Sequence, residues 1–389
     1  MGKYIGIGRK ARQCFGFDDV ALVPGSLTIN PDDVDISWEV AGRRFAVPIV
    51  ASAMDGVVDV RFAVEFGRLG GFAVLNLEGV QTRFADPGEV LDRIGAANPD
   101  ESTHLLQKIY EAPIKKDLVG RRVEEIKAGG APAVVSAIPQ RAAEFGPIAA
   151  EAGCDIFVVQ STVATVEHES KSYESLDFAK FIAGMHERGI PVMVGNTTTY
   201  EVTYALMKTG ADGIFCGVGP GAACTTRGVL GIGVPQITTT VDCAYARDRF
   251  YKMTGRYVPV ITDGGMRVGG DICKAFAAGA DAVMIGSPFA KAHEAPGRGY
   301  HWGMATPHAN LPRGTRVHVG QNASLERILF GPAELDDGSQ NLVGALKTSM
   351  GNVGAHNIRE MQNTEIIIAP AIQTEGKLLQ KAQKIGMAK

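Results

Sequence analysis

The chain has 389 residues, 45% of them hydrophobic, and its 39 Lys and Arg nearly balance its 42 Asp and Glu. This composition supports a sizeable core and excludes a disordered chain. The net charge of -3, with no basic stripe, argues against nucleic-acid binding. No apolar run is long enough to span a bilayer, which argues against a membrane protein.

The cysteines and the first residues of the chain indicate the cellular compartment of the protein. Six cysteines are scattered without a CxxC pair or a His/Cys spacing that fits zinc, so we expect free thiols in a reducing compartment. The opening residues Met1-Gly-Lys-Tyr-Ile contain no apolar signal segment. We therefore expect a cytoplasmic protein.

Short apolar runs recur along the chain, each followed by a stretch with helical periodicity. A near-continuous apolar run is typical of a parallel strand that is buried on both faces. The predicted strands are Val47–Ser52, Phe72–Leu75, Ala133–Ile138, Ile156–Gln160, Pro191–Gly195, Gly213–Cys216, Val258–Thr262 and Ala282–Gly286. The clearest predicted helices are Arg141–Ala152, Phe178–Arg188, Tyr200–Lys208 and Gly270–Ala278.

This alternation of strands and helices predicts an α/β fold, a (β/α)8 TIM barrel, with a doubly wound open sheet as the alternative. A repeated corner favours the barrel. Gly153-Cys-Asp155, Gly210-Ala-Asp212 and Gly279-Ala-Asp281 each stand directly before a predicted strand, and each marks the same helix-to-strand turn.

Two irregular excursions interrupt this rhythm. Residues 78–130 are charged and contain Pro, with room for helices at Leu105–Tyr110 and Leu118–Ala128. Residues 291–345 are rich in Gly, Pro and His. Long excursions at the mouth of a barrel commonly carry binding loops. We interpret residues 1–389 as a single catalytic domain.

The loop after the sixth strand is a candidate site, because barrels place their chemistry at the carboxyl ends of the strands. It runs from Gly217 through Gly219 and Gly221 to Cys224 and Thr226. Its glycines allow positive φ and a close approach to a ligand. A thiolate presented on such a loop is a nucleophile.

The seventh and eighth strands end in residues whose amides suit a phosphate group. Gly264 and Gly265 follow the seventh strand, and Gly286 and Ser287 follow the eighth. Asp263 beside them can accept hydrogen bonds from ribose hydroxyls. Flavin and nucleotide barrels share this pattern, so it does not identify the ligand.

Two further patterns are weaker. The glycine run before Cys224 also resembles a dinucleotide-binding fingerprint, but Pro220 disrupts the helix start that the fingerprint needs. The eight histidines show no spacing typical of metal ligands. His301 and His308 either contact a ligand or are exposed loop residues.

Other motifs extend over nearly the whole chain. They are Phe17-Asp-Asp-Val-Ala-Leu-Val-Pro24, Ser52-Ala-Met54-Asp55, Gly195-Asn196, the Cys224 loop, Asp263-Gly-Gly265, Gly269-Gly-Asp271, Gly279-Ala-Asp-Ala-Val-Met-Ile-Gly-Ser287, Glu294-Ala-Pro-Gly297 and Gly303-Met304. In this order they resemble the IMP dehydrogenase/GMP reductase family. The resemblance implies a (β/α)8 barrel, usually a homotetramer, that acts on a purine nucleotide with a nicotinamide cofactor.

The resemblance also implies roles for the matching residues. The Cys224 thiolate attacks C2 of the purine, with Thr226 near the attacking water or ammonia. In the dehydrogenase, hydride leaves C2 for NAD and water converts the thioimidate to XMP; in the reductase, ammonia leaves GMP and NADPH returns the hydride. Residues implied to bind the nucleotide are Ser52, Met54, Gly219, Gly221, Asp263, Gly264, Gly265, Gly286, Ser287, His301, Gly303 and Met304, and those implied on the cofactor side are Gln160, Ser161, Thr162, Asn196 and Gly217.

The chain departs from the family's pattern in several places. Dehydrogenases of the family usually carry paired CBS domains, which residues 78–130 cannot hold. Gln160 replaces an Asp that meets the cofactor, Ala222 a phosphate-binding Ser, and Phe215 an Arg. The segment before Arg313 is shorter than the family's mobile flap.

These features leave several functions open. An NAD-dependent IMP dehydrogenase is our preferred interpretation. By the resemblance, Arg313 stands where family members carry Glu or Gln, so the Glu that the reductases use is missing. The missing CBS module and the short flap favour an NADPH-dependent GMP reductase. The replacements at 160, 215 and 222 also fit a nucleotide-binding relative with little catalysis, and a flavin barrel is a fourth alternative.

Potassium is a further expectation from the resemblance. Family dehydrogenases bind it with carbonyls of the cysteine loop and with a neighbouring subunit's C-terminal Glu-Gly. Gly219, Gly221 and Cys224 match the loop, and Thr374-Glu-Gly376 resembles the tail. The alternative for the tail is a cap for a helix over Lys377–Ile385.

Arg313 generates a testable prediction. A cationic side chain cannot protonate leaving ammonia as a carboxylic acid does, so we expect Arg313, with His308, to position or deprotonate the hydrolytic water. A surface Arg near the phosphate is the alternative. Arg313→Ala should leave hydride transfer largely intact and slow XMP release, which comparison of the burst of reduced cofactor with steady-state turnover would show. Unchanged turnover would refute the role.

Overall fold

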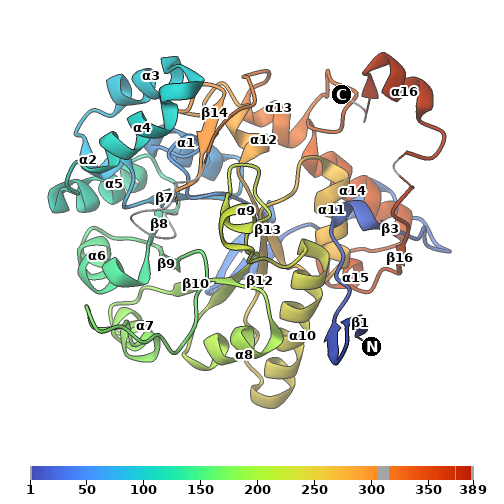
Figure 1. The fold of residues 1–389 in the computed structure, drawn as a ribbon, viewed down its shortest axis with the longest axis horizontal. Coiled ribbons are helices and arrows are strands. Elements are labelled where there is room, and N and C mark those ends of the chain that lie inside the picture. Colours follow the sequence, from blue (N-terminus) through green and yellow to red (C-terminus); the bar gives the residue numbers. More distant parts are fainter. Residues whose placement is uncertain (1, 305–314, 373, 387–389) are drawn as a thin grey trace.

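The computed structural model describes residues 2–304, 315–372 and 374–386, and eight parallel strands within them close into a barrel (Figure 1). Each strand pairs with the next one in the chain, and the last pairs with the first. The strands are β6 (Ile49–Ala51), β7 (Phe72–Asn76), β8 (Val134–Ala137), β9 (Ile156–Gln160), β10 (Val192–Thr197), β11 (Gly213–Cys216), β12 (Val260–Asp263) and β13 (Ala282–Ile285). The predicted TIM barrel is confirmed, and every predicted strand matches one of these.

A helix follows each strand along the outside of the barrel. These helices are α1 (Val60–Arg68), α5 (Lys116–Ala128), α6 (Pro139–Glu151), α7 (Phe178–His186), α8 (Tyr200–Lys208), α10 (Gln236–Thr254), α11 (Gly269–Ala277) and α14 (Leu342–Val353). One of them, α10, has no counterpart among the helices predicted from the sequence. The buried face of α10 includes Gln236, Thr240 and Arg247, and these polar residues hide the apolar periodicity of the helix.

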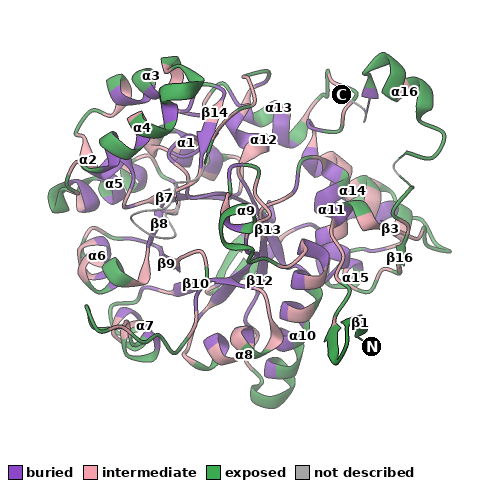
Figure 2. Cartoon of the chain, viewed as in Figure 1, coloured by how far each residue is buried: buried purple, intermediate pink, exposed green. Residues whose placement is uncertain are grey.

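Alternate residues of the strands face two separate cores, as the pleat of a strand requires. Val134, Val158 and Phe215 lie in the cluster inside the barrel, together with Ile261 and Met284. Their sequence neighbours, such as Val135 and Val159, pack outward in the larger cluster that includes the helices. Figure 2 shows the strands as the most continuously buried part of the chain.

The repeated Gly-x-Asp corner joins neighbouring strands at the start of the barrel. Each aspartate accepts a side-chain hydrogen bond from a backbone N–H at the start of the preceding strand, and its own N–H donates to the carbonyl of that same residue. The pairs are Asp155 with Ala133, Asp212 with Val192, and Asp281 with Val260. This two-bond connection explains why the motif recurs before strands.

An aromatic hairpin covers the amino end of the barrel. It consists of β4 (Trp38–Val40) and β5 (Arg43–Phe45). The rings of Trp38 and Phe45 lie 6.0 Å and 4.8 Å from that of Phe72, centroid to centroid. Because this end is filled with side chains, the opposite end is left for a site.

The two excursions contain more regular elements than expected, among them helices that include the predicted Leu105–Tyr110 and Leu118–Ala128, and they pack together. The first forms α2 (Val80–Arg83), α3 (Gly88–Ala96), α4 (Pro99–Tyr110) and α5, and the second contains α12 (Ser287–Ala290), the hairpin of β14 (Tyr300–Trp302) and β15 (Arg316–His318), and α13 (Leu325–Phe330). Trp302 is buried among the apolar residues of α3 and α4, and its Nε1 donates to the Tyr110 hydroxyl at 2.8 Å.

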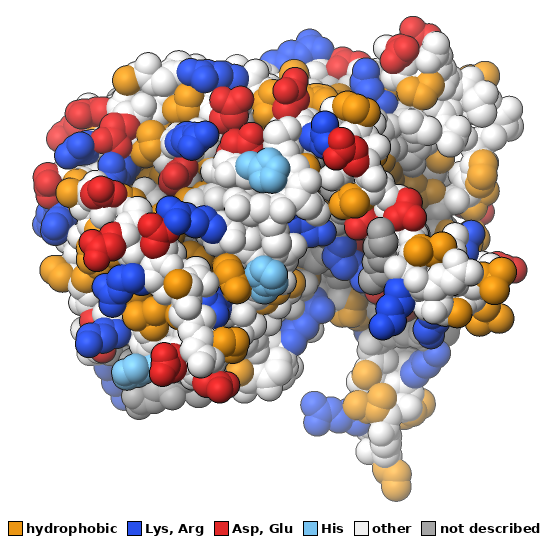
Figure 3. Space-filling view, turned by 90° about the horizontal axis from the view of Figure 1, so that it is seen from above, with side chains coloured by type: hydrophobic (Ala, Val, Ile, Leu, Met, Phe, Trp, Pro, Cys, Tyr) orange, Lys and Arg blue, Asp and Glu red, His pale blue; other side chains and the backbone are white. Residues whose placement is uncertain are grey.

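The remaining elements lie outside the barrel and its helices. They are β1 (Lys3–Gly6), β2 (Arg9–Ala11), η1 (Phe17–Asp19), β3 (Val20–Leu22), η2 (Pro31–Asp33), α9 (Thr226–Leu230), α15 (Ile358–Met361), β16 (Ile366–Ile368) and α16 (Leu378–Gln383). None of the helices in the described ranges is both long and apolar enough to cross a membrane. Basic and acidic side chains are interspersed on the face drawn in Figure 3.

The corner at Asp281 generates a stability prediction. Asp281 also accepts a 2.7 Å bond from the guanidinium of Arg247, and both side chains are buried. Asp281→Ala removes the buried carboxylate partner of that guanidinium and leaves it the exposed Asp248 at 2.9 Å, so the free energy of unfolding should fall by about 3–5 kcal/mol.

Urea denaturation provides the measurement, with Arg44→Ala as the control. Arg44 forms an exposed ion pair with Asp35 at 3.0 Å, so its loss should cost less than about 1 kcal/mol. Similar losses in the two variants would contradict this account of the corner.

Candidate active site

The carboxyl ends of the barrel strands surround a cavity of about 1180 Å³. Residues at or just after the end of every barrel strand line it. Pockets for a single small ligand usually span about 300–1,000 Å³, so this cavity has room for more than one ligand group.

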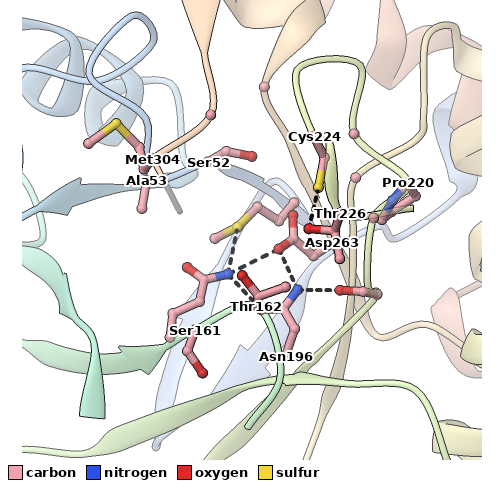
Figure 4. A pocket seen from close by; sticks show the side chains of 18 of the residues that line it. Ser52, Ala53, Ser161, Thr162, Asn196, Pro220, Cys224, Thr226, Asp263 and Met304 are labelled. Carbon is pink, nitrogen blue, oxygen red and sulfur yellow. Dashed lines mark hydrogen bonds between the residues drawn. The ribbon is translucent and has the colours of Figure 1, made fainter. Parts of the chain in front are cut away.

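The Cys224 loop forms one wall of the cavity. Of the six cysteines, all within the described residues, Cys224 is the exposed one. Its thiol lies 3.2 Å from the buried Thr226 hydroxyl, the first residue of α9 (Figure 4). Burial raises the pKa of Cys154 to about 12 and that of Cys273 to about 11, which keeps both protonated. The structure therefore distinguishes Cys224 by its exposure.

Glycines hold this loop in a shape that a side chain would prevent. Gly217 and Gly219 have φ of 139° and 77°. A Cβ on Gly217 would lie 2.4 Å from the carbonyl oxygen of Asp263, and one on Gly219 would lie 2.6 Å from Cγ of Arg227. Arg227 in turn donates to the carbonyls of Val218 and Val234 and holds the loop in place.

The predicted phosphate cradle lies beside the loop. Gly264 and Gly265 have φ of 84° and 83°, and a Cβ on either would lie within 3.1 Å of Pro220. A Cβ on Gly286 would lie 2.9 Å from Sδ of Met54. Backbone therefore faces the cavity where the sequence predicts an anion.

A polar network links the ends of β9, β10 and β12. Nε2 of Gln160 donates to Oδ2 of Asp263 at 3.0 Å and to Oδ1 of Asn196 at 2.9 Å. Nδ2 of Asn196 donates to the same Asp263 oxygen and to the carbonyl of Gly217, both at 2.8 Å. A carboxylate at position 160 would bring Asp263 a second negative charge instead of a donor. This explains why an amide, rather than a carboxylate, fits at position 160.

Burial raises the pKa of Asp263 to about 6, although the bonds from Asn196 and Gln160 oppose the shift. Its carboxylate is the acceptor at the centre of the network. Such a group can still accept bonds from sugar hydroxyls when ionised.

The loop of residues 161–177 forms the opposite wall. Ser161 and Thr162 line the cavity there, as expected of the cofactor side. Two more residues of this loop also line it and were not predicted. The rings of His168 and Tyr173 stack at 5.7 Å, and Nε2 of His168 lies 2.7 Å from the Tyr173 hydroxyl. The irregular loop gives no periodic signal, and only its aromatic residues could have indicated the pair.

His301 is buried on β14 and is 1% exposed, so the exposed-loop alternative is wrong for this residue. Its Nε2 lies 3.0 Å from Oγ of Ser287. Ser52, Gly303 and Met304 also line the cavity. His308 and Arg313 lie outside the described residues.

The predicted potassium site consists of backbone carbonyl oxygens of the Cys224 loop. The carbonyl of Gly221 accepts a 3.0 Å bond from the N–H of Cys224. No group of three or more His, Cys, Asp or Glu side chains in the described residues could hold a metal ion. Potassium on loop carbonyls stays a prediction.

Comparison with known proteins gives consistent matches. A family model described as IMP dehydrogenase / GMP reductase domain matches residues 14–377. An uncharacterized oxidoreductase from Mycolicibacterium smegmatis is 39% identical, covering 94% of this chain and 99% of its own length. An inosine-5'-monophosphate dehydrogenase from Cryptosporidium parvum is 30% identical, covering 89% of each chain.

A solved structure matches as well. The crystal structure of an IMP dehydrogenase/GMP reductase-like protein from Corynebacterium glutamicum has a TM-score of 0.88 at 34% identity. The match covers 94% of this chain and 97% of that one. The likeness therefore extends over nearly all of both molecules.

Asp263 generates a prediction about pH. Its folded pKa of about 6 lies above the ordinary value near 4, so the folded protein binds this proton more tightly than the unfolded chain does. Ionised Asp263 therefore lowers stability above pH 6, and the loss disappears below about pH 4. Asp263→Asn should raise the free energy of unfolding by about 1–2 kcal/mol at pH 7.5 and by less at pH 4.5.

Denaturant titration at the two pH values provides the measurement. The amide keeps an oxygen that can accept from Asn196 and Gln160, so the network's geometry is preserved. A variant that is less stable at pH 7.5, or a gain that does not shrink on acidification, contradicts the explanation.

Proposed function

The chain belongs to the IMP dehydrogenase/GMP reductase family and is an oxidoreductase of that family, and we propose that it oxidises IMP to XMP with NAD. One observation carries the proposal: the exposed Cys224 thiol and the glycine backbone at Gly264, Gly265 and Gly286 open into the same cavity. This arrangement suits a nucleotide whose phosphate is held at one end while a nucleophile attacks its base.

The cavity's residues divide into an anchor and a reacting end. The N–H of Gly264 donates to the carbonyl of Met284 at 3.0 Å, so the phosphate would accept bonds from the backbone N–H groups of Gly265, Gly286 and Ser287, and Asp263 would accept from the ribose hydroxyls. Met54 and Met304 supply apolar surface for the purine. These contacts would place C2 of the base against Sγ of Cys224.

The proposed reaction begins when the Cys224 thiol loses its proton and its sulfur bonds to C2 of IMP. The carbon's hydrogen leaves as hydride, which leaves a thioimidate between Cys224 and the purine. Water then adds to C2, the carbon–sulfur bond breaks, and the thiol regains a proton as XMP departs. Thr226 is the hydroxyl within 3.2 Å of the sulfur, where it can hold the thiol or the water.

The second wall of the cavity supports NAD as the proposed cofactor. The cavity continues from Cys224 to the 161–177 loop, where the stacked rings of His168 and Tyr173 offer a flat surface for an adenine base. Ser161 and Thr162 supply hydroxyls, and Asn196, whose amide is engaged by Gln160, Gly217 and Asp263, would hold these groups in place on the nicotinamide side. These residues fit a dinucleotide, which when bound would supply the hydride acceptor.

GMP reductase is the second candidate. The segment between β7 and β8 forms α2 to α5 and holds no CBS module, and the lack of this module favours the reductase. Potassium binding and a homotetramer also remain proposals that rest on the family alone.

The assay that tests the proposal follows reduced nicotinamide absorbance. IMP with NAD should give turnover, and GMP with NADPH should give little. Cys224→Ala should lower kcat by at least about 10³-fold, because the covalent step needs the sulfur. Cys14→Ala is the matched control, because that thiol is half-buried and lies outside the cavity lining.

Faster oxidation of NADPH with GMP would establish the reductase instead. Undiminished turnover in the Cys224 variant would remove the proposed mechanism altogether.

A further inference from the structure

The side chain of His301 lies beside the phosphate cradle formed by Gly265, Gly286 and Ser287. Of its two ring nitrogens, one is within hydrogen-bond distance of Ser287, and the other has no such partner among the described residues. Its Nε2 lies 3.0 Å from Oγ of Ser287, and both residues line the cavity. Its Nδ1 is buried and has no hydrogen-bond partner among the described residues. A buried imidazole with an unpartnered nitrogen is costly, so its position next to an anion site calls for an explanation.

We propose that His301 is neutral in the free protein and takes up a proton from solvent when a phosphate monoester dianion binds at Gly286 and Ser287. His301 is then a positioning residue that acts through Ser287 and through its charge. This inference rests on the proposed function, because it takes the ligand to be a nucleotide monophosphate.

The hydrogen bond between Ser287 and His301 explains how one proton changes the site. A hydroxyl has a single hydrogen to donate. In the tautomer with its hydrogen on Nδ1, the neutral imidazole accepts the Ser287 hydrogen at Nε2, and Ser287 has none left for a phosphate oxygen. When the imidazole is protonated, Nε2–H donates to Oγ instead, and the hydroxyl hydrogen turns to the phosphate. From this tautomer, proton uptake adds one donor from Ser287 and one positive charge at the anchor; from the tautomer with its hydrogen on Nε2, it adds the positive charge and an N–H at Nδ1.

The surroundings of His301 favour the neutral form until an anion arrives. Burial lowers its pKa to about 4, so the free protein holds it neutral at physiological pH. An opposite charge a few ångströms away raises the pKa of such a group by about 1–3 units, and a dianion carries two such charges. The shift required for protonation near neutral pH is within that range.

Other charged and titratable groups on the packed elements are engaged elsewhere. On β15, Arg316 donates to carbonyls at the end of α3, and His318 packs against the ring of Tyr300. In the loop after β6, Asp55 accepts bonds from a backbone N–H and from a tyrosine hydroxyl. The four residues of α12 are Ser, Pro, Phe and Ala, so α12 brings no charge.

The consequence is discrimination between nucleotide and nucleoside. Inosine carries no anion, so it would leave His301 neutral and Ser287 turned toward the imidazole. IMP would draw in the proton and gain both contacts. The affinity for IMP should therefore fall as pH rises through the pKa of His301 in the complex.

The test observes the imidazole directly in the wild-type protein. Histidines labelled with ¹³C at Cε1 are followed by NMR from pH 5 to 8.5, free, with inosine and with IMP, and His301→Gln assigns the signal. Direct observation is needed because the phosphate itself titrates near pH 6 and confuses proton counting. We expect His301 to stay neutral in the free and inosine-bound protein, and its pKa to rise by at least about two units with IMP.

Binding of IMP and inosine to variants gives a second readout. His301→Gln should weaken IMP about 10-fold at pH 6.5, remove the part of the pH dependence that comes from the imidazole and leave inosine unchanged. His318→Gln, on the exposed side of the same hairpin, should leave IMP binding as it is.

An imidazole that stays neutral in the IMP complex, or a His301→Gln variant with undiminished preference for IMP over inosine, overturns the inference. Failure of the proposed function has a different signature, because IMP would then not bind or would not be oxidised with NAD. Inorganic phosphate is a separate probe for that case. If inorganic phosphate raises the pKa of His301 while no nucleotide is turned over, the proton uptake holds and only the proposed function fails. If inorganic phosphate does not raise this pKa, the inference fails as well.

Discussion

Closure of an eight-stranded parallel sheet is the constraint on which the rest of this structure depends. Parallel strands that close on themselves must bring all their carboxyl ends around one opening. Here the amino end is filled by Trp38 and Phe45 packed on Phe72, so the carboxyl end alone is hollow. Ser52 follows the first barrel strand and Ser287 follows the last; they are far apart in the chain and line one cavity because of this closure.

The corner aspartates contribute to that closure at the opposite end from the site. Asp155, Asp212 and Asp281 each connect the start of one strand to the start of the preceding one through two hydrogen bonds. In contrast, Asp263 stands at the carboxyl end with its charge partly desolvated and only neutral amides as partners. One end of the barrel is built for stability, and the other accepts a cost in stability that a ligand can offset.

The excursions connect the barrel's mouth to a second, smaller core. Trp302 is buried in the cluster of α3 and α4, while its neighbour His301 on β14 faces the phosphate cradle. The Tyr110 hydroxyl accepts from Trp302 and donates to Asp55, next to Met54 of the cavity wall. The inserted helices therefore support the strand that carries two wall residues, Gly303 and Met304, at its end.

The sequence by itself determined the barrel and most of the site. Buried parallel strands are continuous apolar runs, and glycines at strand ends permit backbone shapes that other residues cannot adopt, so both leave local signals such as Ile156–Gln160 and Gly264-Gly265. Only the tertiary structure decided that α10 is a helix with a polar buried face, that Gln160 bonds to Asp263, and that His301 is buried against Ser287. The two contacts join residues that are 103 and 14 positions apart, and the helix depends on which of its faces is covered; the spacing of residues along the chain records neither.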